Sequence, residues 1–246
     1  MGLLYSLRSL LFVVIVAVSL VIFVPFLLLF FRTSLETRNR VARWWMYFHR
    51  ALVQHLGGID FRVEGLDALP GSAVIYFAKH QSTWETLVLQ TLLPHYVWIL
   101  KKEALRIPFF GWGLALLEPI AIDRSSGRKA VDQIVDQGKV WIERGSGILI
   151  FPEGTRREPG AEPDYKIGGG ILAVATGAPV VPVALNSGMF WPPKSLFLKR
   201  PGTIDLRFGP AFDPSGMTPE QVVAKAQDWI EPTCRELMQQ AEFRNR

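Results

Sequence analysis

Apolar residues dominate the start of the chain and then follow two different periods. Residues 10–31 form a run of 22 residues without a charge, which is long enough to cross a bilayer as a helix. Residues 34–56 repeat apolar positions at helical spacing and place tryptophans beside arginines. This second segment starts with a candidate capping box, Thr33 with Glu36, and ends at a pair of glycines. The pattern therefore predicts two N-terminal helices, the second of them amphipathic.

After Gly58 short β-type runs alternate with helical ones. The predicted strands are 61–63, 73–77, 96–100, 120–122, 148–151, 180–185 and 204–208. The predicted helices are 84–93, 128–143, 171–176 and 219–242, the last as one or two helices. This alternation predicts an α/β fold with a mainly parallel central sheet flanked by helices. We therefore expect hydrophobic and amphipathic membrane-anchoring helices over residues 1–58 and an α/β domain over 59–246.

The charge distribution indicates a membrane surface. Residues 1–50 carry six arginines and one acidic residue, a net charge of +5, whereas the other 196 residues carry 21 basic and 21 acidic side chains. Most of the arginines follow the apolar run, so the positive-inside rule places the main domain on the cytoplasmic face of the inner cell membrane. Anionic lipid headgroups would attract the same arginines. The net-neutral domain disfavours a nucleic-acid partner.

Alternatives for the N-terminal segments stay open. A cleaved signal peptide competes with a membrane helix, but its apolar stretch should be shorter and should end in small residues. Pro25 interrupts the apolar run, so the first helix either spans the bilayer or lies within one leaflet. Residues 34–56 fit a bilayer interface and fit equally well a helix packed on its own domain.

The first candidate site follows the strand predicted at 73–77 and has the sequence Lys79-His80-Gln81-Ser82-Thr83-Trp84-Glu85. A carboxylate that accepts the Nδ1 proton of a histidine fixes its tautomer and stabilises the imidazolium formed when Nε2 takes a proton. His80 and Glu85 are therefore a candidate base and its orienting acid. The five-residue spacing alone is weak evidence for a catalytic pair, because His55 and Asp60 have the same spacing. That second pair lies at a helix end, where we expect a cap and turn.

The second candidate site is Phe151-Pro152-Glu153-Gly154-Thr155-Arg156, directly after a strand. Gly154 permits a tight turn, and Glu153 could accept a hydrogen bond from a substrate hydroxyl. Arg156 offers a planar fork suited to bidentate phosphate binding. The plain alternative is a turn with a solvated arginine.

Further cations follow neighbouring strands. Lys101 and Lys102 end one strand, Arg124 follows another, and Lys166 precedes a triple glycine. In a parallel sheet these strand ends share one edge, so the cations could converge on one anion. The alternative is that these cations are merely solvated side chains at the rim of the sheet.

Missing motifs narrow the chemistry. The chain has no G-x-S-x-G elbow, which disfavours an acyl-serine intermediate. It has no His-Glu-x-x-His motif, and its one cysteine, Cys234, gives no metal cluster and no internal disulfide. We therefore expect neither a metal nor a cofactor.

Four blocks in order resemble the 1-acylglycerol-3-phosphate O-acyltransferase (lysophosphatidic acid acyltransferase) family. They are Lys79-His80-Gln81-Ser82 with an acid at the fifth following place; Lys101-Lys102-Glu103 leading to Pro108-Phe109-Phe110-Gly111 and Ile122-Asp123-Arg124; Phe151-Pro152-Glu153-Gly154-Thr155-Arg156; and Val180-Val181-Pro182-Val183. The resemblance covers residues 74–185, and the N-terminal helices look like that family's membrane-embedded pair.

The resemblance implies roles for these residues. His80 would be the general base, and Glu85 stands where the family usually has aspartate, a change that moves the carboxylate by ~1.5 Å. The implied substrate-binding residues are Lys101, Arg124, Glu153, Gly154, Thr155 and Arg156. Backbone N–H groups at the helix start after His80 are candidate donors to the oxyanion.

The implied reaction moves a fatty acyl group from acyl-acyl carrier protein or acyl-coenzyme A to the sn-2 hydroxyl of 1-acylglycerol 3-phosphate. The product would be phosphatidic acid for phospholipid biosynthesis, and the partners would be membrane lipids, lysophosphatidic acid and the acyl thioester. Glycerol 3-phosphate or a lyso-aminolipid is an alternative acceptor. A catalytically silent membrane lipid-binding protein is the alternative from another class.

Overall fold

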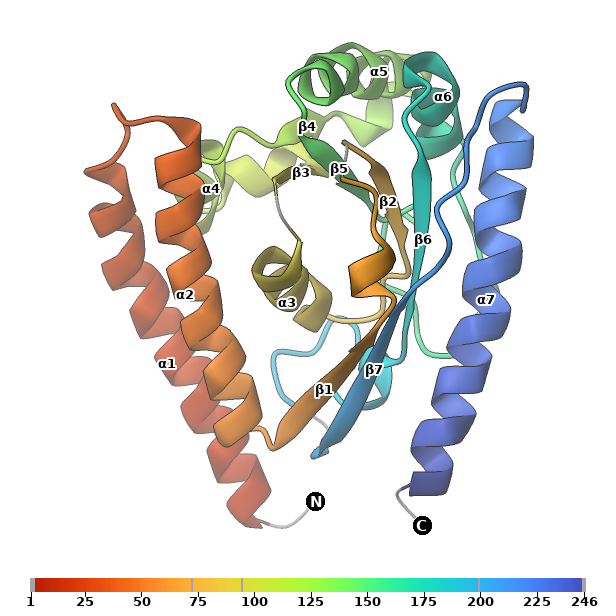
Figure 1. Cartoon of the computed structure of the whole chain (residues 1–246). Coiled ribbons are helices and arrows are strands. Elements are labelled where there is room, and N and C mark those ends of the chain that lie inside the picture. Colours follow the sequence, from red (N-terminus) through yellow and green to blue (C-terminus); the bar gives the residue numbers. More distant parts are fainter. Residues whose placement is uncertain (1–2, 72, 94, 199, 245–246) are drawn as a thin grey trace.

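The computed structural model describes residues 3–71, 73–93, 95–198 and 200–244. Its centre is a seven-stranded sheet in the order β1-β7-β6-β2-β5-β3-β4 (Figure 1). The strands are β1 (Ile59–Glu64), β2 (Ile75–Ala78), β3 (Tyr96–Lys101), β4 (Ile120–Ile122), β5 (Gly147–Ile150), β6 (Val180–Leu185) and β7 (Gly202–Phe208). β6 and β7 pair antiparallel, and the other neighbours pair parallel. The predicted mainly parallel α/β fold is confirmed.

Helices cover both faces of this sheet (Figure 1). They are α1 (Leu3–Leu28), α2 (Leu35–His55), α3 (Trp84–Leu92), α4 (Phe110–Ala115), α5 (Arg128–Glu143), α6 (Gly168–Thr176) and α7 (Pro219–Arg244). One apolar cluster joins α1, α2 and α3 to the sheet, and a second joins α5, α6 and α7 to its other face. Because β2, β5 and β6 are buried on both sides, every residue in them is buried and nearly all are apolar.

The triple glycine belongs to a helix, although the sequence pattern predicted that this helix begins at Ile171. α6 starts at Gly168 instead. A side chain on Gly169 would place Cβ 2.6 Å from Cζ of Phe77, and one on Gly170 would place it 2.3 Å from the carbonyl oxygen of Pro219. Close packing against β2 and α7 therefore requires these glycines and outweighs their low helix propensity.

The cap of α2 differs from the predicted capping box. Ser34 is the N-cap, and its Oγ accepts a hydrogen bond of 3.2 Å from the N–H of Thr37. The hydroxyl of Thr33 donates instead to the carbonyl of Phe30 in the turn after α1. Glu36 pairs with Arg40 one turn along the helix. The N-cap of α2 is therefore Ser34, one residue after the predicted Thr33.

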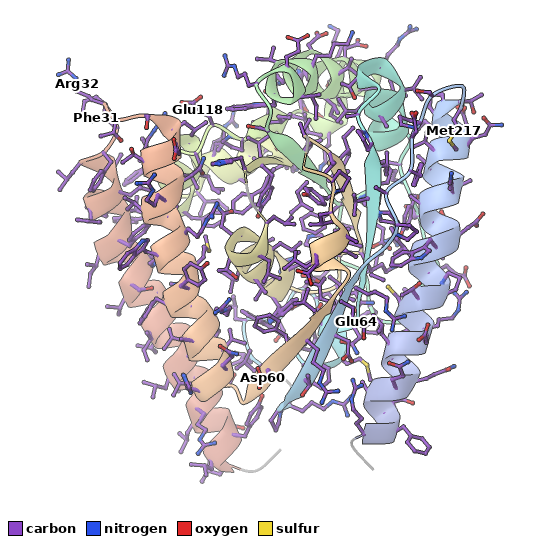
Figure 2. The ribbon with its side chains drawn as sticks, in the orientation of Figure 1. Phe31, Arg32, Asp60, Glu64, Glu118 and Met217 are labelled. Carbon is purple, nitrogen blue, oxygen red and sulfur yellow. The ribbon has the colours of Figure 1, made fainter. Side chains whose placement is uncertain are left out.

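α1 is long and apolar enough to cross a membrane, and only 17% of its most apolar window is buried inside the molecule. Phe31 and Arg32, just beyond it, project away from the body (Figure 2). On its inner side Phe12 packs edge-on against Trp191 at 5.3 Å, and Ser19 hydrogen bonds to His49 of α2 at 3.0 Å. The exposed apolar side of α1 indicates association with a membrane.

Candidate active site

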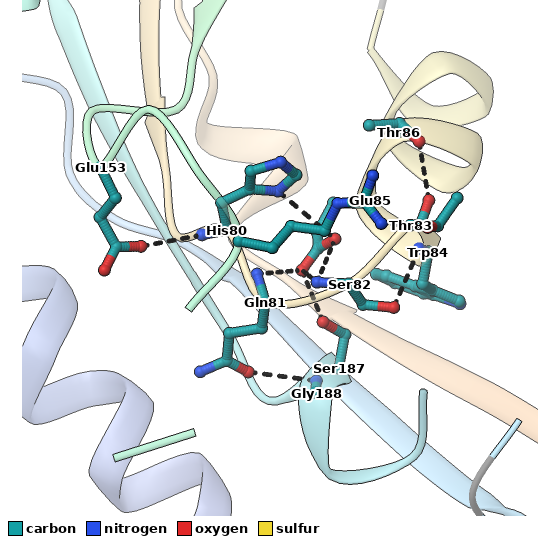
Figure 3. Close-up of polar contacts among 11 residues, drawn as sticks. His80, Gln81, Ser82, Thr83, Trp84, Glu85, Thr86, Glu153, Ser187 and Gly188 are labelled. Carbon is teal, nitrogen blue, oxygen red and sulfur yellow. Dashed lines mark hydrogen bonds and ion pairs between the residues drawn. The ribbon is translucent and has the colours of Figure 1, made fainter. Parts of the chain in front are cut away.

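The strand register brings the two predicted motifs together. β2 and β5 pair in parallel with Phe77 opposite Ile150. Three residues beyond this pair, the N–H of His80 donates to Oε2 of Glu153 at 3.3 Å (Figure 3). The carbonyl of His80 accepts from the N–H of Arg157 at 2.8 Å. The loop after β5 therefore holds the main chain of His80 on both sides, at the carboxyl edge of the sheet, where ligands bind in such folds.

The ring of His80 is held between an aromatic face and a carboxylate. It stacks on Phe151, with ring centroids 3.9 Å apart and planes at 18°. Its Nδ1 lies 3.8 Å from Oε2 of Glu85, and among the described residues this buried nitrogen has no hydrogen-bond partner. The side chain of His80 is 13% exposed, so the ring is partly open to solvent. This geometry suits a base that a nearby carboxylate orients by its charge.

Glu85, in the first turn of α3, is fully buried and saturated with donors. The N–H groups of Gln81 and Ser82 each donate to it at 2.9 Å (Figure 3). The hydroxyl of Ser187 donates to its Oε1 at 2.6 Å. Hydrogen bonds of this kind stabilise a buried carboxylate. Glu85 therefore organises the whole turn between β2 and α3.

The same hydrogen bonds change the expectation for the oxyanion donors. We predicted that N–H groups at the helix start after His80 would face the reacting carbonyl. The N–H groups of Gln81 and Ser82 donate to Glu85, and that of Trp84 donates to Oγ of Ser82 at 3.1 Å. These three donors are engaged within the turn.

Two arginines lie at the loop that follows β5. Nη1 of Arg156 donates to Oγ1 of Thr83 at 2.7 Å, so the guanidinium is held next to the His80–Glu85 segment. Arg124, which follows β4, hydrogen bonds to the carbonyl of Gly154. Gly154 has φ +67°, a left-handed conformation in which glycine is favoured. The loop after β5 thus carries Arg156 and accepts a hydrogen bond from Arg124.

The lysines at the strand ends are placed differently. Nζ of Lys101 lies 3.7 Å from Oε2 of Glu103 and is half exposed. Lys102 forms an ion pair with Asp123, and the hydrogen bond from Lys102 lowers the pKa of Asp123 to about 2. Lys166 pairs with Asp164 on the surface. Arg156, which contacts Thr83, and Arg124, which contacts Gly154, are therefore better placed than these three lysines to act beside His80.

A cavity of about 430 Å³ lies against the loop that follows β5. Phe151 lines it and also stacks on His80. Its lining combines apolar residues with charged ones, among them Ile99, Ile122, Ile134, Ile150, Arg124, Lys166, Glu153 and Asp164. The cavity has the character needed for an apolar chain with an anionic group at its end.

The alternative pair, His55 and Asp60, lies in a turn. His55 is the last residue of α2 and is exposed. Asp60 accepts from the side chain of Gln54 at 3.0 Å and from the N–H of Phe61, at the start of β1 (Figure 2). This matches the interpretation of the pair as a helix end and turn.

A histidine beside a buried carboxylate at the carboxyl edge of a parallel sheet, with an arginine held next to it, suits base-catalysed chemistry on an anionic substrate. The sequence model of the acyltransferase family matches residues 60–186. The chain belongs to this acyltransferase family.

Individual relatives agree with that assignment. The chain is 41% identical over 200 residues to the 1-acyl-sn-glycerol-3-phosphate acyltransferase of Pseudomonas aeruginosa, covering 80% of this chain and 77% of that protein. It is 29% identical over 188 residues to a chloroplast 1-acyl-sn-glycerol-3-phosphate acyltransferase of Brassica napus, covering 73% of this chain and 53% of that longer protein. The chain thus spans about half the length of the Brassica relative.

The fold has a solved counterpart. The crystal structure of the 1-acyl-sn-glycerophosphate acyltransferase PlsC from Thermotoga maritima superimposes with a TM-score of 0.78 at 24% sequence identity. The match covers 95% of this chain and 98% of that one, so it includes the N-terminal helices as well as the sheet.

Proposed function

We propose that this protein is a 1-acylglycerol-3-phosphate O-acyltransferase, which moves a fatty acyl group from a thioester to the sn-2 hydroxyl of 1-acylglycerol 3-phosphate. The product is phosphatidic acid. The observation that carries the proposal is the His80 ring held between Phe151 and Glu85, with Arg156 fixed to Thr83 beside it. The Pseudomonas aeruginosa relative, whose name states this activity, supports it across most of the chain.

His80 acts as the general base. Its Nε2 takes the proton of the acceptor hydroxyl while that oxygen attacks the thioester carbonyl. Glu85, 3.8 Å from Nδ1, stabilises the imidazolium that results. The tetrahedral intermediate then collapses, the carbon–sulfur bond breaks, and the imidazolium returns its proton to the leaving thiolate. Free thiol and acylated lipid are the products, and the reaction needs no cofactor beyond the thioester, carried by acyl carrier protein or coenzyme A.

The arginines hold the phosphate of the acceptor. Arg156 lies in the loop after β5 and Arg124 hydrogen bonds to that loop, and a guanidinium fork binds phosphate through paired hydrogen bonds. Lys101 adds positive charge at the same edge. Gly154 and Thr155 shape the space for the glycerol backbone, with Glu153 behind them.

Residues 1–58 anchor the chain to the inner cell membrane, with the α/β domain on the cytoplasmic face. The exposed apolar side of α1 supports attachment to a membrane, and the arginines that follow the apolar run favour the cytoplasmic face for the domain. The segment around Leu198 is attached to α1, because the N–H of Leu198 donates to Oγ of Ser9 at 2.9 Å. In the same segment Leu196 is 69% and Phe197 49% exposed. The acceptor, a membrane lipid, would thus reach the site along the membrane surface.

Product analysis tests this function. Purified protein in detergent would be given an acyl thioester of either carrier with one acceptor at a time: 1-acylglycerol 3-phosphate, glycerol 3-phosphate or a lyso-aminolipid. We expect phosphatidic acid, identified by mass spectrometry, with the first acceptor in clear preference. Equal or faster acylation of another acceptor would assign the enzyme to that substrate. No acylation of any acceptor by folded protein would favour a lipid-binding protein.

A further inference from the structure

A buried ion cluster adjoins the turn between β2 and α3 that carries His80 and Glu85, which we call the catalytic turn. Lys79 precedes His80, and only 2% of its side chain is exposed. Its Nζ donates to Oε1 of Glu153 at 2.8 Å and to Oε1 of Glu231 at 2.7 Å. Glu231 comes from α7, which packs beside β6 on the opposite side of the sheet from α3 (Figure 1). The cluster therefore connects the C-terminal helix to the residue that precedes the base.

Tyr165 completes the cluster. Its hydroxyl donates to the same Oε1 of Glu231 at 2.9 Å. Burial, together with the charges of Glu231 and Glu153, raises the pKa of Tyr165, so that it remains a donor. Burial lowers the pKa of Lys79, but the hydrogen bonds and charges of Glu153 and Glu231 outweigh this and raise it above its ordinary value. Lys79 is therefore a fixed positive charge.

Both carboxylate oxygens of Glu153 accept hydrogen bonds. Its Oε1 accepts from Lys79, and its Oε2 accepts from the N–H of His80. This carboxylate thus bridges the ammonium to the main chain of the base. A buried ion group of this kind is a poor source of stability, because desolvation offsets much of the attraction between the charges. Its position next to His80 indicates that it fixes the geometry of the main chain at that residue.

We propose that Glu231 is a positioning residue for the reaction, acting through Lys79 and Glu153 on the main chain of His80. The inference rests on the function proposed above. Glu231 lies outside residues 60–186, the segment that matches the acyltransferase family. α7 thus completes the active site from a part of the chain that carries none of the four sequence blocks.

The physical reason is the sharing of one ammonium between two carboxylates. Without the charge on Glu231, the ammonium of Lys79 moves towards Glu153, its remaining anionic partner. That shift pulls Oε2 of Glu153 away from the N–H of His80. A displacement of ~1 Å in a reacting group can cost on the order of 100-fold in rate. The loss of rate falls on the chemical step, and so on kcat. Neither Lys79 nor Glu231 is among the residues proposed to bind the acceptor phosphate.

The test compares Glu231→Gln with Glu231→Asp by the rate of thiol release from the acyl thioester, with 1-acylglycerol 3-phosphate as acceptor. Glu231→Gln should lower kcat by about tenfold and leave KM for the acceptor within about twofold. Glu231→Asp keeps the charge and should recover part of the lost kcat. The matched control is Glu236→Gln on the same helix, which removes an exposed ion pair with Arg207. The control should keep wild-type kcat.

The outcomes separate this inference from the proposed function. No turnover by folded wild type would reject the function itself. Wild-type kcat in a folded Glu231→Gln protein would overturn the positioning role, and so would an equal loss of kcat in the control. If Glu231→Gln fails to fold, Tyr165→Phe removes one hydrogen bond from the same oxygen. That variant should lower kcat by about threefold with KM unchanged, and an unchanged kcat would overturn the inference.

Discussion

Nδ1 of His80 and Oε2 of Glu85 lie 3.8 Å apart, too far for a hydrogen bond but close enough for a strong charge interaction. The carboxylate is fixed there by the N–H groups of Gln81 and Ser82 and by the hydroxyl of Ser187. The longer side chain of glutamate, in place of the family's usual aspartate, thus reaches its donors within the turn and stops just short of the ring. A small closure on substrate binding would form the hydrogen bond.

Removing the charge on Glu85 tests its orienting role. In Glu85→Gln the amide nitrogen faces the N–H of Ser82 in either orientation, because that N–H donates to both carboxylate oxygens, so we expect a lower Tm as well as a kcat reduced by about 100-fold. Thermal unfolding and steady-state thiol release measure the two effects separately. Glu85→Asp, which restores the charge, should recover most of the kcat. A kcat of Glu85→Gln within threefold of wild type would contradict the orienting role.

Arg156 should affect acceptor binding more than the chemical step. Arg156→Lys keeps the charge but loses the planar fork, so KM for 1-acylglycerol 3-phosphate should rise about tenfold with a smaller change in kcat. Arg128→Lys, an exposed arginine at the start of α5, is the control and should behave as wild type. If both variants kept the wild-type KM, Arg156 would not hold the phosphate.

The glycines of α6 should be needed for stability. Gly170→Ala would place a methyl group 2.3 Å from the carbonyl oxygen of Pro219, so α6 and α7 must separate. The expected cost is about 1–3 kcal/mol of unfolding free energy, measured by urea denaturation. Gly71→Ala is the matched control, because among the described residues no atom beyond the chain neighbours lies within 4 Å of the added Cβ. Equal stability of the two variants would show that the α6–α7 contact tolerates expansion.

Cys234 should not react in the folded protein. Burial raises the pKa of its thiol to about 12, so that on the order of one molecule in ten thousand carries a thiolate at pH 8. Iodoacetamide should label the protein slowly in buffer and rapidly in urea, as followed by mass spectrometry. Rapid labelling without denaturant would mean that α7 opens locally around Cys234.

The sequence pattern predicted the strands well because most of them are fully apolar runs bounded by polar turns. It also placed the segments around His80 and Arg156 directly after two strands of a mainly parallel sheet, and the observed pairing of Phe77 with Ile150 brings these two strand ends side by side. The short helix α4 was not predicted, because its six residues include two glycines and two aromatic residues. The glycine start of α6 was missed for a similar reason, since contacts with β2 and α7 override local propensity there.

The supporting residues of the site could not be found from the sequence. Ser187 lies 102 residues from Glu85, and Glu231 lies 152 residues from Lys79. Neither has a spacing or a motif that connects it to the catalytic turn. Their roles follow from the positions of β6 and α7, which only the assembled sheet defines. The sequence could therefore predict a candidate base and phosphate site but not the residues that hold them.

The most direct test of the central claim is thiol release from an acyl thioester by wild type and by His80→Ala, each with and without 1-acylglycerol 3-phosphate. The account predicts release by wild type that depends on the lysolipid and a fall of about 100-fold or more in His80→Ala at equal protein level and Tm. Undiminished, lysolipid-dependent release by a folded His80→Ala protein would contradict the assignment of His80 as the base.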